Sequence, residues 1–247
     1  MTAKKLQALL LGALNHSLFV YAIYLMSQQL FYGLTLKPLV NFSNPSLVNL
    51  FLIVQFPLLH SWLLTKKGRA LLSSKFLGNN SQSLAPTFYT TIASLQLILT
   101  FGFWQPTNTI IWQATQYESL FSFFYISTWA LLGWSMFSAG LGLQTGAIGW
   151  ISVLKDKIPS YPKEFPISGL FSICRQPIYL SFALIMWSGP IMTLDKLFLA
   201  SAWSGYCFFG PRLKEKRFYA KWGSSFRAYQ ERVPYFLPLK GSNIKLP

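Results

Sequence analysis

Long apolar blocks constrain the fold of this chain more than any other feature of its sequence. A helix needs about 20 mostly apolar residues to cross a lipid bilayer. Four blocks are near that length, and two shorter ones follow: 9–31, 47–64, 86–104, 120–143, 177–194 and 197–210. We therefore expect an all-α, polytopic membrane bundle of about five or six transmembrane segments, folded as a single membrane domain over residues 1–247. The last two blocks predict a helical hairpin that either crosses the bilayer or re-enters it.

The composition supports the membrane class. Hydrophobic residues make up 52% of the chain and charged residues 11%, whereas soluble domains carry about 25% charged residues. The first apolar block is longer than a signal-peptide core, and no clear small-residue cleavage site follows it. We therefore expect a retained first helix.

The positive charges predict an orientation in the membrane. The chain carries 21 Lys and Arg against 6 Asp and Glu, and the basic residues lie in the loops between apolar blocks. If the N-terminus is cytoplasmic, the outer loops hold Lys37 and Lys196, and the other 19 basic residues lie inside. The positive-inside rule thus predicts that both termini are cytoplasmic. The expected partner of this charge is a bilayer with anionic headgroups on the cytoplasmic face, not a nucleic acid.

Few of the usual catalytic or metal-binding patterns are present. The two cysteines, Cys174 and Cys207, form no CxxC pair and are expected to be small apolar residues. We find no Ser-His-Asp arrangement, no glycine-rich phosphate loop and no metal-ligand spacing.

Residues 171–238 hold the densest group of side chains that could bind a ligand. The stretch begins FSICRQPIYLSF and ends RLKEKRFYAKWGSSFRAYQERVPYFLP. Arg175 before Pro177 also fits an ordinary helix start with an interfacial arginine. Glu215 among basic residues also fits an amphipathic surface helix. The prolines and interleaved aromatic residues of the tail are too irregular for a plain lipid-binding helix, which favours a binding site.

These two motifs resemble those of a known family. RQPIYLSF is similar to the RHPxYxGF motif of the isoprenylcysteine carboxyl methyltransferase superfamily, and the tail is similar to that family's RxEE…FGxxYxxYxxxVPxxxP pattern. Within the superfamily, the chain most resembles the methanethiol S-methyltransferase and NnrU-like groups. That resemblance extends to NLFLIVQFPLLHSWLLTKKG, FGFWQPTNTIIW and SGPIMTL.

The resemblance implies a membrane methyltransferase. It would bind S-adenosylmethionine near the cytoplasmic face and methylate a thiol, a carboxylate or another small lipophilic substrate. Residues 1–143 would form a four-span scaffold, 144–176 a cytoplasmic connector, and 177–247 the hairpin and tail that bind the cofactor. Glu215 would hold a polar or cationic part of the cofactor. The other implied cofactor-binding residues are Arg175, Gln176, Pro177, Tyr179, Arg227, Tyr229, Val233 and Pro234; no catalytic residue is implied.

Four positions depart from the family pattern. Gln176 stands in place of His, Ser181 of Gly, Lys214 of the first Glu, and Phe226 of the first Tyr of the tail. Glutamine cannot carry a proton near neutral pH, and Lys214 reverses a charge beside a cationic cofactor. Residues that shape the motifs remain: Pro177, Tyr179, Gly223, Tyr229, Val233, Pro234 and Pro238. An alternative is therefore a non-catalytic membrane subunit that keeps the methyltransferase scaffold.

The only two histidines, His16 and His60, lie in the first two apolar blocks. The simpler interpretation of His60 is a polar residue that bonds between helices. NnrU relatives include a haem-dependent carotenoid isomerase, and two inward-facing histidines could bind one haem iron. An NnrU-like haem-dependent isomerase is thus a second alternative.

Overall fold

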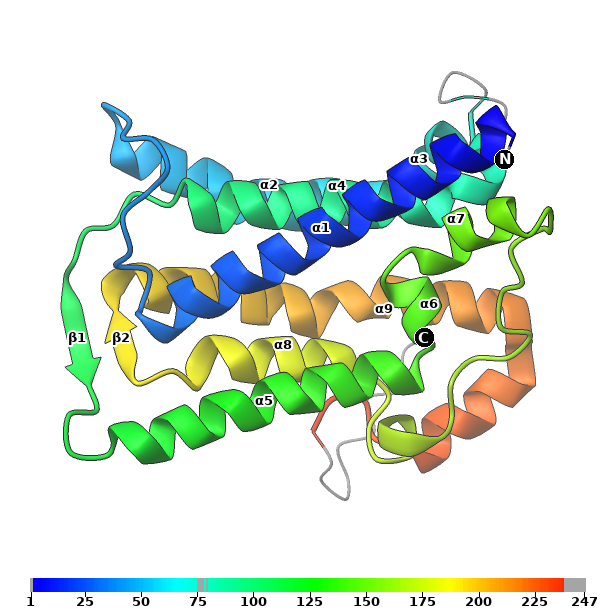
Figure 1. The fold of residues 1–247 in the computed structure, drawn as a ribbon. Helices are drawn as coiled ribbons and strands as arrows, with labels where there is room; N and C mark the ends of the chain where they lie inside the picture. Colours follow the sequence, from blue (N-terminus) through cyan, green and yellow to red (C-terminus); the bar gives the residue numbers. More distant parts are fainter. Residues whose placement is uncertain (1, 75–77, 79, 238–247) are drawn as a thin grey trace. The chain divides into compact units, whose positions relative to one another are not determined.

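The computed structural model describes residues 2–74, 78 and 80–237 and is mostly helical (Figure 1). Four of the described helices are long and apolar enough to cross a membrane: α1 (Ala3–Phe31), α2 (Pro45–Leu63), α4 (Ser81–Gly102) and α5 (Glu118–Ser138). They coincide with the first four apolar blocks, which confirms a helical protein with several membrane-length helices. The total of five or six segments stays a prediction.

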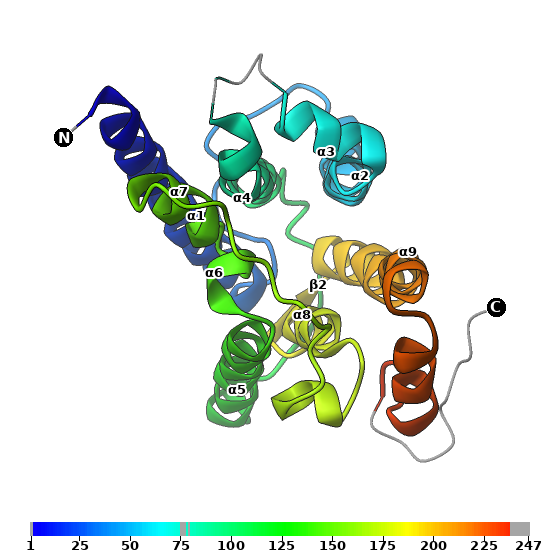
Figure 2. The ribbon, with the colours of Figure 1, turned by 90° about the vertical axis from the view of Figure 1, so that its right-hand side faces the viewer.

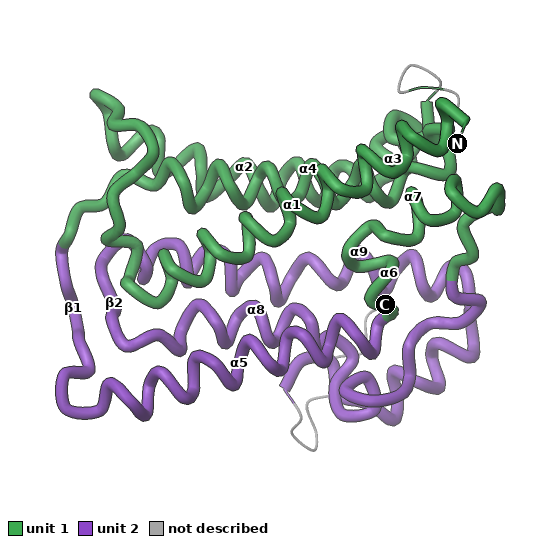
Figure 3. Tube along the Cα trace, viewed as in Figure 1, with its two compact units in different colours: residues 1–108, 140–161 green, residues 109–139, 162–247 purple. Residues whose placement is uncertain are grey.

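The chain divides into two compact units (Figure 3). One unit contains residues 1–108 and 140–161, and the other contains residues 109–139 and 162–247. Both units thus combine segments that are distant in sequence. The single membrane domain stays a prediction, and each unit is described by itself below.

The first unit is built around α4. This helix packs against α1 and α2, and the short helix α7 (Ala147–Leu154) packs against both α1 and α4. Two other short helices complete the unit, α3 (Lys66–Leu72) and α6 (Leu141–Gln144). A Cβ atom on Gly12 of α1 would lie 2.5 Å from the indole ring of Trp150. Only a glycine lets α7 approach α1 this closely.

Polar side chains join the long helices of this unit. The amide oxygen of Asn15 accepts hydrogen bonds from Thr90 at 2.7 Å and Thr91 at 3.0 Å, while its nitrogen donates to the carbonyl of Thr145 at 2.8 Å. Gln55 and Gln96 join α2 to α4, because Gln96 Nε2 donates to Gln55 Oε1 at 2.9 Å. Polar groups in an apolar environment need such partners, so these bonds fix which helix faces meet.

The second unit contains α5, α8 (Pro177–Trp187) and α9 (Leu194–Arg232). Helix α8 packs against both of the others, and the hydroxyls of Ser135 and Ser181 lie 3.2 Å apart between α5 and α8. Strand β1 (Ile110–Gln113) pairs antiparallel with β2 (Ile191–Thr193), which separates α8 from α9. Ser181 thus fills a small space between helices at the position where the family pattern has glycine.

Helix α9 is longer than the last apolar block predicts. It begins at the Thr193 cap, whose hydroxyl accepts from the Lys196 amide at 3.1 Å. It continues through Pro211 and reaches Arg232, with one break at Gly223 where φ is +50°. The helix changes direction there (Figure 2). The hairpin block that we expected to end at residue 210 is therefore only the first part of a longer helix.

Candidate functional site

The candidate site lies in the second unit, where the start of α8 meets the C-terminal half of α9. Pro177 is the first residue of α8, a position that proline favours because its fixed φ suits a helix start. Arg175 and Gln176 immediately precede the helix and are 2% and 1% exposed. Both polar side chains are therefore fixed in the protein interior.

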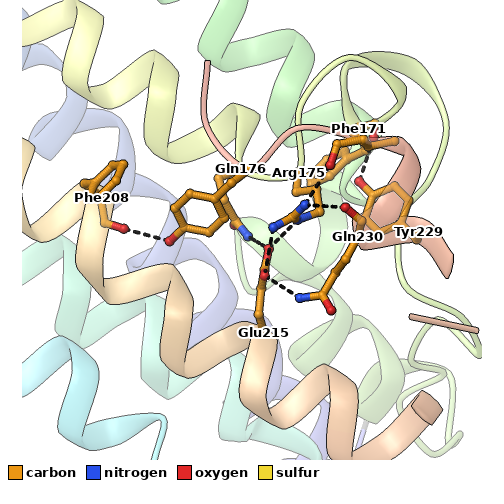
Figure 4. A network of polar contacts seen from close by, with 9 residues as sticks. Phe171, Arg175, Gln176, Phe208, Glu215, Tyr229 and Gln230 are labelled. Atoms are coloured by element: carbon orange, nitrogen blue, oxygen red, sulfur yellow. Dashed lines mark hydrogen bonds and ion pairs between the residues drawn. The ribbon is translucent and has the colours of Figure 1, made fainter. Parts of the chain in front are cut away.

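A buried ion pair forms the centre of the site (Figure 4). Arg175 Nε lies 2.9 Å from Glu215 Oε1, and Nη2 lies 3.4 Å from Oε2. Arg175 Nη1 also donates to the carbonyls of Gln230 at 2.9 Å and Val233 at 2.7 Å. A buried pair is stable only when its remaining polar atoms also find partners. These bonds meet that condition and tie together the start of α8, the middle of α9 and the segment after α9.

Two side-chain amides also donate hydrogen bonds to the Glu215 carboxylate. Gln176 Nε2 donates to Oε1 at 2.7 Å, and Gln230 Nε2 donates to Oε2 at 2.8 Å. Both oxygens of Glu215 are thus held by the protein's own side chains. The predicted contact between Glu215 and a cofactor stays a prediction.

The tail folds back over this ion pair. The Tyr229 hydroxyl donates to the Phe171 carbonyl at 2.6 Å, and the Arg175 amide donates to the Pro234 carbonyl at 2.9 Å. Burial raises the pKa of Tyr229 above its usual value, so the hydroxyl keeps the proton it donates. Phe226 is 2% exposed in an apolar cluster with Tyr229 and Val233. That apolar packing accounts for a phenyl ring where the family pattern has tyrosine.

A small pocket with a cavity volume of about 10 Å³ lies beside the ion pair. Its lining residues come from the connector, the start of α8, α9 and the tail: Phe165, Pro166, Phe171, Arg175, Gln176, Lys214, Glu215, Phe218, Phe226 and Tyr229. Lys214 Nζ lies 6.0, 5.5 and 5.6 Å from the ring centroids of Phe171, Tyr179 and Phe218. Desolvation lowers the pKa of Lys214 to about 8.

Comparison with curated proteins identifies relatives that align with most of the chain. Methanethiol S-methyltransferase 1 of Bradyrhizobium diazoefficiens is 28% identical over 198 residues, which cover 79% of this chain and 68% of that protein. Methanethiol S-methyltransferase 2 of the same organism is 27% identical over 212 residues, covering 80% and 75%. The chain is a distant homologue of the methanethiol S-methyltransferases.

The similarity to methanethiol S-methyltransferases extends to other bacteria. The enzyme of Mycobacterium tuberculosis is 26% identical over 198 residues, covering 77% of each chain. No protein-family model matches the chain, and no solved structure matches it. The family resemblance predicted from the two motifs is thus confirmed by relatives that align with most of the chain.

The residues that we predicted from the methyltransferase motifs are not all in one place. Arg175, Gln176, Glu215 and Tyr229 line the pocket. Pro177 starts α8, the half-buried Tyr179 contacts Lys214, and Val233 and Pro234 bond to Arg175 through their carbonyls. Arg227 is different: its side chain is 65% exposed and lies 3.9 Å from Glu231. Pro238, from the same motif, lies outside the described residues.

Sequence reasoning missed several residues of the site. Gln230 directly follows Tyr229 and binds Glu215, although the family pattern marks no residue there. Phe165 of the connector packs against the cluster of Phe226, Tyr229 and Val233. The connector was expected to be a simple cytoplasmic link, and nothing in its local sequence indicates this contact.

The two histidines of the haem hypothesis have different partners in the first unit. His16 Nδ1 lies 2.9 Å from Asn15 Nδ2, and its ring packs edge-on against Trp150. His60 Nε2 lies 2.7 Å from the Tyr89 hydroxyl, which joins α2 to α4. The contact of His60 agrees with the simpler interpretation of a polar residue between helices. Haem binding stays a prediction, and an absorption spectrum without a Soret band would exclude it.

Proposed function

We propose that this chain is an integral-membrane methyltransferase that transfers a methyl group from S-adenosylmethionine to a small thiol. The observation that carries this proposal is the alignment of 77–80% of the chain with three proteins named methanethiol S-methyltransferase. The membrane-length helices support the same class of protein. We favour a thiol over the carboxylate and other lipophilic acceptors because the names of these relatives specify S-methylation.

The side chains around the pocket match part of the proposed cofactor in chemistry, although not in space. When bound, S-adenosylmethionine supplies a methyl group activated by a positively charged sulfur. Aromatic rings favour a cation of that kind, but the Lys214 ammonium already faces Phe171, Tyr179 and Phe218. Gln176 Oε1, which has no hydrogen-bond partner among the described residues, offers an acceptor. The cavity volume of about 10 Å³ is far below the roughly 300–1,000 Å³ of typical ligand sites and has room for about one water molecule. Binding of the cofactor here therefore requires the surrounding side chains to move.

The chain's own contribution to the reaction is to position and desolvate the reactants. Methyl transfer is a direct displacement of the methyl group from one atom to another. An enzyme that holds both reactants in line lowers the barrier, because the entropy of bringing them together is lost on binding and not in the reaction step. The Arg175–Glu215 pair fixes the start of α8 against α9 and so keeps the pocket walls in place. The apolar cluster around Phe226 excludes water from one side.

We further propose that both termini and the site are cytoplasmic, facing anionic headgroups. The charge distribution of the sequence supports this orientation. In the first unit, Lys4 and Lys5 pair with Asp156. The start of α1 and the segment just after α7, which contains Lys155 and Lys157, are thereby at the same end of that unit. Basic residues from distant segments thus gather at one end of the first unit, as the proposed orientation requires.

Isothermal titration calorimetry with S-adenosylmethionine tests the proposed function. We expect saturable binding to the purified protein in detergent or lipid nanodiscs. An absence of binding at millimolar cofactor, in protein that is folded and monodisperse, would contradict it.

A second candidate function is a non-catalytic membrane subunit that keeps this scaffold. It is favoured by the small pocket and by the commitment of both Glu215 oxygens to internal hydrogen bonds. This candidate predicts a stable larger complex after mild solubilisation and no cofactor binding by that complex. Cofactor binding by the isolated chain would count against it.

A further inference from the structure

The pocket beside the Arg175–Glu215 pair is almost filled by the side chains that line it. Its cavity volume of about 10 Å³ has room for about one water molecule. Phe165, Pro166 and Phe171 of the connector form one part of the lining, and the start of α8 and the C-terminal half of α9 form the rest. A larger ligand therefore enters this site only if one of these walls moves.

Most of the walls are held by buried polar contacts (Figure 4). Arg175 Nε bonds to Glu215 at 2.9 Å, and its Nη1 donates to the Val233 carbonyl at 2.7 Å. The Tyr229 hydroxyl donates to the Phe171 carbonyl at 2.6 Å. Separating a buried ion pair leaves an uncompensated charge in the interior, which is strongly unfavourable. These walls are therefore costly to move.

Residues 162–168, which we call the strap, are held by far fewer bonds. In the part of the chain that the structure describes, no backbone amide of the strap donates to another backbone group, and two of its residues are prolines. Its carbonyls accept two hydrogen bonds, from Trp222 Nε1 to Lys163 at 3.2 Å and from the Phe171 amide to Ser168 at 3.2 Å. Segments with so few bonds open locally while the rest of a fold stays intact.

The main attachment of the strap is the ring of Phe165. Its centroid lies 5.0 Å from that of Phe226, 5.2 Å from that of Tyr229 and 5.4 Å from that of Trp222. Ile167, two residues further along the strap, is 50% exposed. Release of the Phe165 ring from this cluster breaks apolar contacts and separates no charges.

We propose that the strap is a lid over the pocket and that Phe165 is its latch. When the ring leaves the cluster, the strap opens and exposes the pocket, while the Arg175–Glu215 pair stays intact. The ligand that the open lid admits is S-adenosylmethionine, so this last step rests on the proposed function. Opening of the strap itself does not require a ligand and is measurable without one.

Limited proteolysis of the full chain in nanodiscs tests whether the strap opens. Trypsin cleaves after lysine, and its rate within a closed segment follows the population of the open form. Lys163 lies in the strap, and Lys157 is an exposed lysine of the same connector outside it. We expect Phe165→Ala to raise the rate of cleavage after Lys163 about tenfold or more and to leave cleavage after Lys157 unchanged. Cleavage of the unfolded chains corrects for any effect of the substitution on trypsin itself.

Two further variants make the test specific. Ile167→Ala removes an exposed apolar side chain from the same strap and should leave cleavage after Lys163 unchanged. Trp222→Phe keeps a ring in the cluster but removes the hydrogen bond to the Lys163 carbonyl, and should accelerate this cleavage about two- to tenfold. The melting temperature of each variant verifies folding. If neither Phe165→Ala nor Trp222→Phe is cleaved faster after Lys163, the strap is not a lid.

The rate of cofactor association tests whether the strap controls entry. A ligand that enters only the open form binds at a rate and with an apparent affinity reduced by the closed fraction. Phe165→Ala should therefore associate with S-adenosylmethionine several times faster than the wild type or Ile167→Ala in stopped-flow fluorescence. Faster cleavage with an unchanged association rate would overturn the role of the strap as a lid. Failure of every variant to bind S-adenosylmethionine would contradict the proposed function, while the cleavage rates still decide whether the strap opens.

Discussion

At the residue scale, the buried Arg175–Glu215 pair explains why these polar residues are inside the protein. Each polar atom of the carboxylate is held by a side chain, and the guanidinium also binds two carbonyls of the tail. The pair therefore has a structural role whether or not it touches a ligand. Its motif positions were predictable from the family resemblance, but the pairing itself was not, because 40 residues separate the partners.

We predict that Glu215→Gln strongly destabilises the protein. The substitution leaves the Arg175 charge buried without its counter-ion, at a cost of about 3–5 kcal/mol in the free energy of unfolding. Thermal unfolding in detergent measures the effect. Glu231→Gln is the control on the same helix, because that side chain is 51% exposed and should change stability by less than about 0.5 kcal/mol. Equal effects of the two substitutions would contradict the structural role of the pair.

The lowered pKa of Lys214 predicts how the stability of the fold depends on pH. Desolvation lowers its pKa to about 8 in the folded protein, from 10.5 in an exposed lysine. The unfolded chain therefore binds more protons between these values, so the stability of the fold should rise as the pH increases from about 8 to about 10.5. The comparison is the melting temperature of the wild type minus that of Lys214→Met across this range. A difference that does not increase with pH would show that Lys214 has an ordinary pKa.

At the scale of elements, helix α9 shows what the sequence could and could not predict. The long apolar blocks identify α1, α2, α4 and α5, because bilayer-length apolar helices have few alternative structures. The second half of α9 was not predictable in this way. Its apolar character stops near residue 210 although the helix continues to Arg232, and polarity does not interrupt backbone hydrogen bonding. The contact of Phe165 with the Phe226 cluster was likewise not predictable, because nothing in the sequence around Phe165 indicates it.

Two glycines of α9 give a matched test of its bend. Gly223 has φ +50° and ψ −121°, whereas Gly205 lies within the regular helix. A Cβ atom would meet nothing within 4 Å at either position. Gly223→Ala should cost about 1–3 kcal/mol through backbone strain alone, while Gly205→Ala should be neutral or stabilise by up to about 1 kcal/mol. If thermal unfolding of the two variants were the same, the helix would not bend at Gly223.

At the scale of the whole molecule, the chain consists of two compact units with different internal contacts. The first unit is fixed by polar pairs such as Asn15 with Thr90 and Gln55 with Gln96. The second unit contains the two motifs that resemble those of the methyltransferase family, and the pocket. The chain's distant homology to methanethiol S-methyltransferases spans segments of both units, because the alignments cover up to 80% of its length.

The proposed orientation is testable on the intact protein. Because the basic residues gather in the loops assigned to the inside, both termini should be cytoplasmic. Reporter proteins fused to the C-terminus, with the fusion expressed in a bacterial inner membrane, show on which side of that membrane the C-terminus lies. A green fluorescent protein fusion should fluoresce, and an alkaline phosphatase fusion should be inactive. The reverse pattern would place the C-terminus outside and contradict the charge argument.

An assay of methyl transfer decides whether the proposed activity is correct. The purified protein is incubated with S-adenosylmethionine carrying an isotopically labelled methyl group and with small thiols, beginning with methanethiol. We predict that the label appears in the methyl thioether product, which mass spectrometry of the headspace detects. If folded protein transfers no label to any of these thiols, the chain is not the thiol methyltransferase that we propose.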